Sequence, residues 1–444
     1  KGKRMQIMRL FWRELNGYAL KKCYTLMLRC SKGIVRLLNC FIVRLLKTKK
    51  VILVWIPASA GMTFREDLSF VNIIFIMKIK FMFKRLFIRN KFFLPLITIP
   101  IILSLVGLIF IFEASAVSSS RQFGDSLYYL KSQAIWIFFG LIIMAIFSFI
   151  DYHKLYLLSF ISLILTIILL VLVLIPGIGS TVGGARRWID FGFFNLQPTE
   201  LAKFSIIIYL SSWFTNKEKN RFLPFITLMG FLVFLIILQP DMGTAIIIFL
   251  ISLIIYYFSG ANFTDFVFIF GGSILSLYFL IKLSTYRFNR LLSFLNPSVD
   301  PLGISYHINQ IFISLSSGGF FGRGFGASRQ KYLFLPEAHT DSIFAIIGEE
   351  YGFIGGLILI GLYFVFVYKI YHLIRLAPDR LSKLIMIGIF AFFNLQFIVN
   401  LAGMTGLFPI VGVPLPFLSY GGSNLLISFV LIGIMMNIER RVKV

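Results

Sequence analysis

Apolar residues along the chain form long runs that polar residues, glycine and proline interrupt. From residue 93 onward ten runs follow one another, near 93–112, 132–150, 156–175, 199–214, 222–238, 242–258, 266–283, 342–368, 384–408 and 417–437. A helix that crosses a bilayer needs about 20 mainly apolar residues. The pattern therefore predicts an all-α polytopic membrane protein with about ten transmembrane helices. Its longest connection, the outer loop 284–341 between spans 7 and 8, is long enough to indicate a functional segment.

Residues 1–76 differ from the rest of the chain. They mix basic and apolar residues without a sustained helical period, and residues 56–63 resemble the translated product of an intergenic repeat. We interpret this segment as a poorly structured or misassigned N-terminal extension, with the true start at Met77 or Met82. The alternative is a cytoplasmic extension with an interfacial helix. We expect residues 77–444 to form the membrane domain.

Composition narrows the class of protein. Apolar residues make up 58% and charged residues 14% of the chain, against roughly 45–50% and about 25% in soluble domains, which excludes a soluble enzyme and a disordered chain. All three cysteines precede residue 77, which excludes a disulfide scaffold for the membrane domain. The net charge of +25 suggests nucleic acid, but 15 Lys/Arg lie in residues 1–76 and six more in 77–92. Basic residues beside a first span face cytoplasmic membrane lipids, so we expect no nucleic-acid partner.

The distribution of Lys and Arg also predicts the orientation. With the N-terminus inside, the cytoplasmic segments hold 17 Lys/Arg and the outer loops hold 9, which favours cytoplasmic N- and C-termini. Six arginines oppose this trend on the outer side: Arg186, Arg187, Arg287, Arg290, Arg323 and Arg329. An outer anionic ligand would explain them; alternatively they extend to lipid headgroups or pair with local acids.

The densest polar cluster, Glu337, His339 and Asp341, directly precedes the eighth run. A partly desolvated carboxylate at a membrane edge has a raised pKa and suits general-base chemistry. The alternative is that Thr340 or Asp341 only caps the helix. Asp241, at the start of the sixth run, raises the same two possibilities.

Two further groups could bind substrate. Glu200 and Lys203 are three residues apart and share a helix face, where they could also be a structural ion pair. Arg186 and Arg187 carry guanidinium groups that match phosphate oxygens, and the Trp188 indole suits the headgroup level.

Other polar residues lie within the apolar runs. Glu349 and Glu350 are inside the eighth run, where charge is usually functional, although a buried partner such as Lys203 would explain one of them. Amides in the ninth run are expected to bond between helices: Asn394, Gln396 and Asn400. The Pro/Gly-rich segment 408–423, which includes Ser419, cannot be continuous helix and is a candidate cavity wall.

Six motifs occur in order: GARRWIDFG, QPTELAK, QPDMGT, NPSVDPLG, the stretch from Lys331 through LPEAHTDSIFAIIGEEYGFIG, and PLPFLSYGGS. Together they resemble the SEDS family, the FtsW/RodA group of bacterial cell-wall proteins. The resemblance implies a ten-helix peptidoglycan glycosyltransferase that polymerises lipid II at the outer face of the cytoplasmic membrane. It also implies a class B penicillin-binding protein and other divisome proteins as partners.

The resemblance assigns the catalytic role to Asp341, the Asp of the family's HTD motif. It implies that this carboxylate takes a proton from the acceptor's GlcNAc 4-hydroxyl, with inversion at the donor's anomeric carbon. For the departing undecaprenyl diphosphate we expect the cations Arg186, Arg187 and Lys203. The other expected substrate-binding residues are Trp188, Glu200, Asp241, Glu337, His339 and Ser419. Magnesium or manganese could assist the diphosphate, although no carboxylate cluster in the sequence demands a metal.

Several alternatives stay open. The outer segment 112–117 and the residues before LPEAHTD favour the division branch, whereas residues 189–194 and 411–414 favour the elongation branch; we prefer division. Ser342 departs from the family, which usually has an aromatic residue after HTD. A lipid II flippase, lined by Glu349, Glu350 and Lys203, and a non-catalytic divisome scaffold are the rival functions.

Overall fold

The computed structural model describes residues 93–442, except 183, 193 and 217–220. The predictions for residues 1–76 and for the leader 77–92 lie outside this range. The described residues belong to one compact unit, Arg85–Val444.

Every predicted apolar run contains a helix. In chain order these are α5 (Phe93–Phe123), α6 (Tyr128–Phe149), α7 (Lys154–Leu172), α8 (Pro198–Trp213), α9 (Phe222–Ile237), α10 (Met242–Phe258), α11 (Phe263–Lys282), α14 (Ile343–Leu376), α15 (Arg380–Met404) and α16 (Gly422–Glu439). Within the described residues, seven are long and apolar enough to cross a membrane, while α9 and α10 are shorter apolar helices. The chain is therefore a multi-pass membrane protein, and the count of ten spans stays a prediction.

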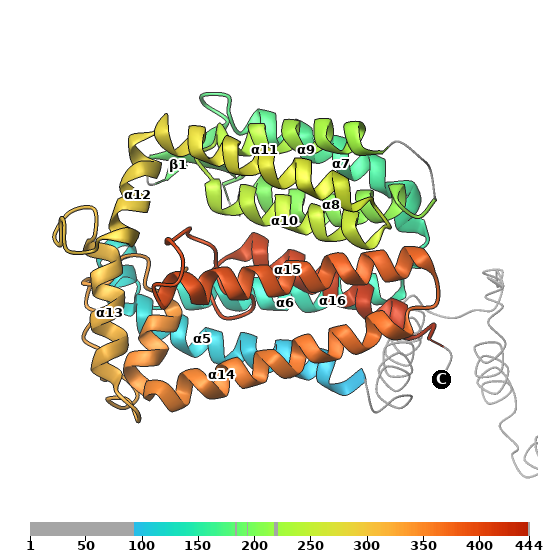
Figure 1. Cartoon of the computed structure of the whole chain (residues 1–444). Coiled ribbons are helices and arrows are strands. Elements are labelled where there is room, and N and C mark those ends of the chain that lie inside the picture. The colour runs from blue at the N-terminus through green and yellow to red at the C-terminus, as the bar shows by residue number, and fades with distance from the viewer. Residues whose placement is uncertain (1–92, 183, 193, 217–220, 443–444) are drawn as a thin grey trace, which may run out of the picture. The chain divides into compact units, whose positions relative to one another are not determined.

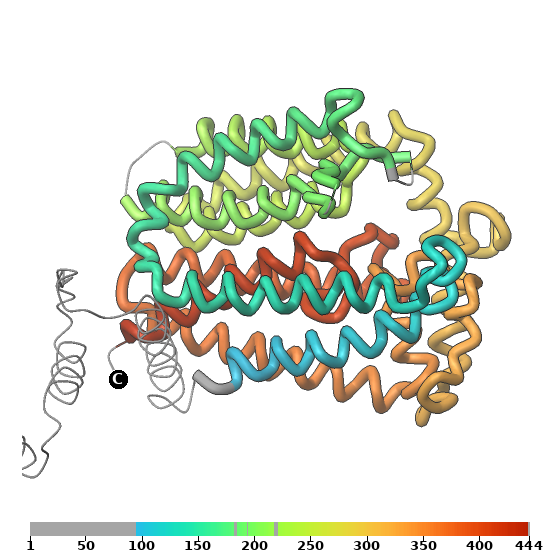
Figure 2. Tube along the Cα trace, turned by 180° about the vertical axis from the view of Figure 1, so that it is seen from behind, coloured from blue at the N-terminus to red at the C-terminus, as the bar shows by residue number. Residues whose placement is uncertain are grey.

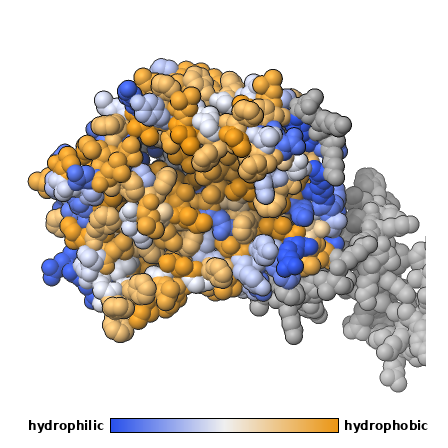
Figure 3. Space-filling view, in the orientation of Figure 1, coloured by the Kyte–Doolittle hydropathy of each residue, from blue (hydrophilic) through white to orange (hydrophobic). Residues whose placement is uncertain are grey.

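The helices of this unit lie in three layers (Figures 1 and 2). Helices α7 to α11 form one layer, α6, α15 and α16 the middle one, and α5 and α14 the third. The middle layer is the core, since α16 packs on α6 and α15 contacts α8, α10 and α14. Helix α11 is peripheral, with Ile269 its one buried residue. Apolar residues dominate the face shown in Figure 3 and hydrophilic residues gather toward its two ends, as expected for a protein in a bilayer.

The outer loop 284–341 contains two helices that the sequence pattern did not predict. They are α12 (Thr285–Leu295) and α13 (Tyr306–Gly318), and they lie at one end of the bundle (Figure 1). Helix α13 packs against the start of α14.

A small antiparallel sheet between α7 and α8, which the sequence pattern did not predict, accompanies the predicted all-α bundle. Its strands are β1 (Gly179–Val182), β2 (Ala185–Asp190) and β3 (Asn195–Leu196), in the order β1-β2-β3. Along β2, Ala185 and Ile189 are buried while Arg186 and Asp190 are exposed. Strand β2 has only six residues, so its pattern of buried and exposed positions could not be recognised as a strand from the sequence.

Helix α14 is broken at Gly352, whose φ of 66° and ψ of −163° are not helical. That conformation is essentially limited to glycine. Residues 319–324 replace the lost helical bonds, because the amides of Arg323 and Gly324 donate to the carbonyl oxygens of Glu349 and Glu350, both at 3.0 Å. On the other side of the break, the Phe353 and Ile354 amides donate to the Gly319 and Phe320 carbonyl oxygens, at 2.9 and 3.2 Å. Backbone groups freed by the break are thus bonded to protein, as is required of irregular backbone within an apolar helix.

The break predicts a specific sensitivity. Gly352→Ala should lower the free energy of unfolding by about 1–3 kcal/mol through its backbone conformation, and more through collision of its Cβ with Gly322 and Phe320. Gly361→Ala, in the same helix, adds a Cβ to open space and should be neutral or slightly stabilising. Thermal unfolding in detergent compares the two, and equal midpoints would contradict this account of the break.

Candidate active site

Asp341 lies in the turn before α14 and is 8% exposed. Its carboxylate accepts a hydrogen bond from Thr340 Oγ1 at 3.1 Å, and its backbone carbonyl accepts one from Asn400 Nδ2 at 2.8 Å. Burial, and secondarily the charge of Glu337, raise the pKa of Asp341 to about 6. The cap interpretation is wrong for this residue, since the N-cap of α14 is Ser342 and carries no side-chain cap bond. Asp341 is thus a buried carboxylate with a raised pKa, which makes it a candidate functional residue.

The broken segment 408–421 forms the facing wall, as the Pro/Gly pattern predicted. At Gly412, φ is 68°, and a Cβ there would lie 3.4 Å from Asp341 Oδ2. A small cavity beside the carboxylate is lined by Asp341, Val399, Asn400, Gly403, Met404, Ile410, Val411, Gly412 and Val413. Its size suits about one water molecule. Asp341 and Asn400 contribute the polar side chains of this cavity.

Asp241 reaches the other side of the same segment. Its side chain accepts a hydrogen bond from the Thr244 amide at 3.3 Å, which confirms the N-cap alternative. At Gly243, a Cβ would collide with the Val411 carbonyl oxygen, so the start of α10 packs directly on this wall. The start of α10 and the Asp341 turn therefore lie on either side of residues 411–412. The Asp241 side chain caps a helix, whereas the Asp341 side chain does not.

Strand β2 brings Arg187 to the turn before Asp241. The guanidinium donates from Nε to the Gln239 carbonyl oxygen at 3.3 Å, and from Nη2 to that of Pro240. Arg186 is exposed and Trp188 half-buried. Arg187 retains further N–H donors beyond these two bonds.

Glu200 and Lys203 form a buried ion pair, with 2.7 Å between Lys203 Nζ and Glu200 Oε1. The ammonium also lies 5.3 Å from the centre of the Phe392 ring. Glu200 Oε2 is buried and has no hydrogen-bond partner in the described part of the chain. These contacts fit a structural ion pair. Because both side chains are buried inside the bundle, a lipid diphosphate has little access to Lys203.

Glu337, His339 and Ser419 surround the Asp341 turn through local contacts. Glu337, at a φ of 49°, accepts the Thr340 hydroxyl at 2.8 Å. The His339 ring lies 4.4 Å from that of Tyr129, and burial lowers the pKa of His339. Ser419 Oγ accepts the Leu415 amide at 2.9 Å. These contacts hold the walls of the site, and roles in substrate binding stay predictions.

Two residues of the outer loop adjoin the site, although the sequence did not single out either for it. Arg290, from α12, donates to the Ile410 carbonyl oxygen at 2.9 Å. His307, from α13, lies with Nε2 2.8 Å from Ser342 Oγ, and burial lowers its pKa to about 4. The unusual Ser342 thus pairs with a histidine. Arg290 was visible in sequence as an outer arginine, but nothing there set it apart from the other five.

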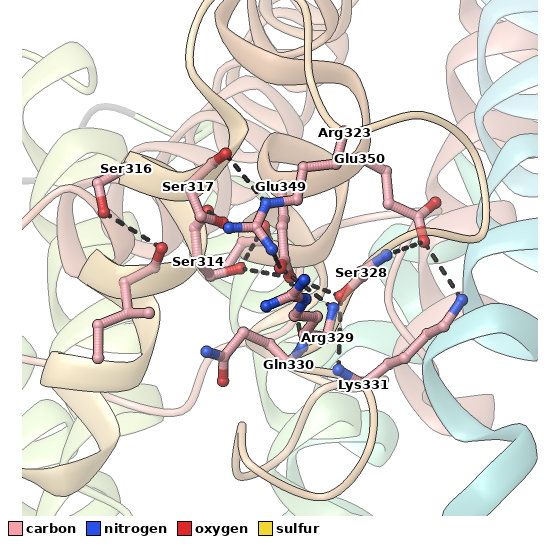
Figure 4. Close-up of polar contacts among 12 residues, drawn as sticks. Ser314, Ser316, Ser317, Arg323, Ser328, Arg329, Gln330, Lys331, Glu349 and Glu350 are labelled. Carbon is pink, nitrogen blue, oxygen red and sulfur yellow. Dashed lines mark hydrogen bonds and ion pairs between the residues drawn. The ribbon is translucent and has the colours of Figure 1, made fainter.

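Glu349 and Glu350 face the outer loop, so the suggestion that Lys203 partners one of them is wrong. Glu349 accepts hydrogen bonds from Ser328 Oγ at 2.5 Å and from the Arg329 amide at 3.1 Å (Figure 4). Glu350 Oε1 lies 3.5 Å from Lys331 Nζ, which lies 2.6 Å from Glu113 Oε2 on α5. We call this set, residues 328–331 with Glu113, Glu349 and Glu350, the loop clamp. It fixes the chain that leads into Leu335–Asp341.

The described residues contain no group of three His, Cys, Asp or Glu side chains that could hold a metal ion. Asp341, Asp241 and Glu200 are engaged in three separate local structures. This donor set does not fit a resident divalent cation.

Comparisons with known proteins agree with the motifs. Residues 92–444 match the FtsW/RodA/SpoVE family, described as "Cell cycle protein". A relative from Trichlorobacter lovleyi, "Probable peptidoglycan glycosyltransferase FtsW", is 39% identical over 79% of this chain and 93% of its own length. Stage V sporulation protein E of Bacillus subtilis is 37% identical over 78% of this chain and 96% of its own.

Solved structures share the fold. One, titled "Structural coordination of polymerization and crosslinking by a peptidoglycan synthase complex", has a TM-score of 0.65 at 24% identity and covers 78% of this chain and 96% of its own. The rod shape determining protein RodA of Thermus thermophilus has a TM-score of 0.59 at 23% identity, covering 79% and 97%. By the extent of these matches, the chain belongs to the FtsW/RodA/SpoVE family.

Proposed function

We propose that this chain is a peptidoglycan glycosyltransferase of the division type, which polymerises lipid II with Asp341 as general base. The single observation that carries the mechanism is the buried Asp341 carboxylate beside a small cavity, with its pKa raised to about 6. The names of the relatives from Trichlorobacter lovleyi and three Geobacter strains support the activity and the division branch.

The chemistry needs one base and one cationic surface. Asp341 accepts the proton of the acceptor's GlcNAc 4-hydroxyl while that oxygen bonds to the anomeric carbon of the donor's MurNAc. The bond from that carbon to the diphosphate breaks, and undecaprenyl diphosphate leaves with the bonding electrons. One displacement inverts the anomeric centre, so the paired carboxylates of a retaining hydrolase are not required.

The leaving diphosphate needs positive charge nearby. Arg186 is exposed and Arg187 keeps free donors, so both can bind phosphate oxygens. Lys203 is buried and neutralised by Glu200 at 2.7 Å, so it is not available to the diphosphate. Arg290, exposed beside the Asp341 wall, takes its place. We route no step through magnesium or manganese, because the carboxylates present do not converge on one ion.

Orientation and partners complete the proposal. Helices α12 and α13 lie at one end of the bundle and the α14–α15 connection at the other (Figure 1). With cytoplasmic termini, the Asp341 end faces outward from the bacterial inner membrane, where lipid II is used. A class B penicillin-binding protein would cross-link the product there, together with other divisome proteins. The flippase alternative loses its main support, because Glu349 and Glu350 are bonded to residues 328–331 within the loop clamp.

The first prediction concerns the base. Purified protein in detergent should polymerise lipid II, and Asp341→Asn should abolish glycan formation because an amide cannot accept the proton. Asp241→Asn should lose less, since that carboxylate caps α10. Asp125→Asn, at an exposed ion pair with Lys131, is the matched control and should retain activity. Near-normal polymerisation by Asp341→Asn would reject the assignment.

The second prediction concerns pH. Only ionised Asp341 can act as base, so the raised pKa places the loss of activity near pH 6 on acidification, above the range of an ordinary aspartate. Glu337 raises this pKa by its charge. Glu337→Gln should therefore shift the acid limb of the pH–rate profile to lower pH. An unchanged limb, or a shift to higher pH, would show that another group controls the profile.

A further inference from the structure

Asn400 has one half of its amide occupied and the other half free. Its Nδ2 donates to the carbonyl oxygens of Asp341 at 2.8 Å and Val413 at 2.7 Å. Both partners are acceptors, so the chemistry itself fixes the orientation of the amide. Asn400 Oδ1 is then left buried without a hydrogen-bond partner in the described part of the chain, on a residue that is 3% exposed.

An unpartnered buried acceptor destabilises the fold, because it has lost its hydrogen bonds to water, and such a group in a native protein needs an explanation such as a bound partner. Asn400 lines the small cavity beside Asp341, and the remaining lining comes from aliphatic side chains, glycine and the backbone. Because Nδ2 is already bonded to two carbonyl oxygens, we infer that Oδ1 is the atom through which Asn400 binds a group that enters this cavity. A cavity suited to about one water molecule admits one hydroxyl group.

We propose that this cavity is the subsite for the hydroxyl next to the attacking one on the acceptor sugar, and that Asn400 is the specificity residue that binds it. The inference rests on the proposed function and deepens it. The attacking 4-hydroxyl lies against the Asp341 carboxylate, and the neighbouring 3-hydroxyl enters the cavity and donates to Asn400 Oδ1. In this arrangement the 4-hydroxyl donates to the Asp341 carboxylate and the 3-hydroxyl donates to Asn400 Oδ1.

The subsite has a chemical consequence. A free hydroxyl at that carbon, as in GlcNAc, supplies the hydrogen that Asn400 needs. A ring that carries an ether there, as in MurNAc, supplies none and leaves the buried acceptor unsatisfied. Because Asn400 also holds the Asp341 carbonyl, filling the subsite is coupled to the position of the base.

The test compares natural lipid II with an analogue whose GlcNAc 3-hydroxyl is replaced by hydrogen. The wild-type enzyme should lose about tenfold in kcat/KM on the analogue, the effect of one hydrogen bond. Asn400→Leu should reduce activity on both substrates and remove the difference between them. Structural damage alone lowers both rates and leaves their ratio unchanged, so the ratio isolates Oδ1.

The matched control is Asn394→Leu on the same helix, whose amide donates to the Phe390 carbonyl oxygen at 2.8 Å. It should keep the wild-type ratio. Equal rates on the two substrates in the wild type, or an unchanged ratio in Asn400→Leu, would overturn the subsite. A wild-type enzyme that does not polymerise natural lipid II would instead reject the proposed function, so the two failures are distinct.

A second variant decides the matter if Asn400→Leu does not fold. Gly403→Ala adds a methyl group to the cavity wall, 3.7 Å from Ile410 Cα, which is an ordinary contact distance. The variant should slow the polymerisation of natural lipid II more than that of the analogue, because the analogue lacks the 3-hydroxyl and leaves room for the methyl group. Gly361→Ala, which points to open space, should not change the ratio. A wild-type ratio in Gly403→Ala would count against the subsite.

Discussion

The structure depends on how carboxylates are accommodated at one end of an apolar bundle. A buried charge is tolerated only when it is paired or hydrogen-bonded, and otherwise its pKa moves. Glu200 forms an ion pair with Lys203. Glu349 and Glu350 are bonded to residues 328–331 within the loop clamp. The Asp341 carboxylate accepts a hydrogen bond from the Thr340 hydroxyl, and it has no ion pair in the described part of the chain. Its free energy of ionisation is raised, and this is why we propose Asp341 as the general base.

The surrounding fold keeps this carboxylate in place through its backbone. Asn400 ties the Asp341 carbonyl to that of Val413, and so joins α15 to both walls of the cavity. The loop clamp fixes the incoming chain, because it binds residues 328–331 to the broken helix α14 and to α5. Gly352 and Gly412 adopt conformations that allow these close approaches. Polar groups inside the bundle therefore position Asp341, the proposed base, while the lipid-facing helices provide the scaffold.

The helices could be predicted from sequence because the surrounding lipid restricts which backbone structures are possible. Lipid forces each spanning segment to satisfy its own backbone, so ten apolar runs predicted ten helices. The Pro/Gly segment also predicted a cavity wall, because it cannot stay helical, and Asp341 of the HTD motif borders that same cavity. The partners of Glu349 and Lys331 could not be predicted, because Glu113 lies 218 residues away from Lys331 in the chain. Nor could Asn400 be separated from Asn394, since only the tertiary structure shows which amide borders a cavity.

The central claim is that an acceptor sugar approaches Asp341 across this cavity. A structure of the protein with the acceptor bound tests it most directly, by the distance between the attacking hydroxyl oxygen and the Asp341 carboxylate. The account predicts hydrogen-bond contact, about 2.6–3.2 Å between these atoms, with the sugar against the 410–413 segment. A sugar bound away from this wall, with its hydroxyl out of reach of Asp341, would contradict it.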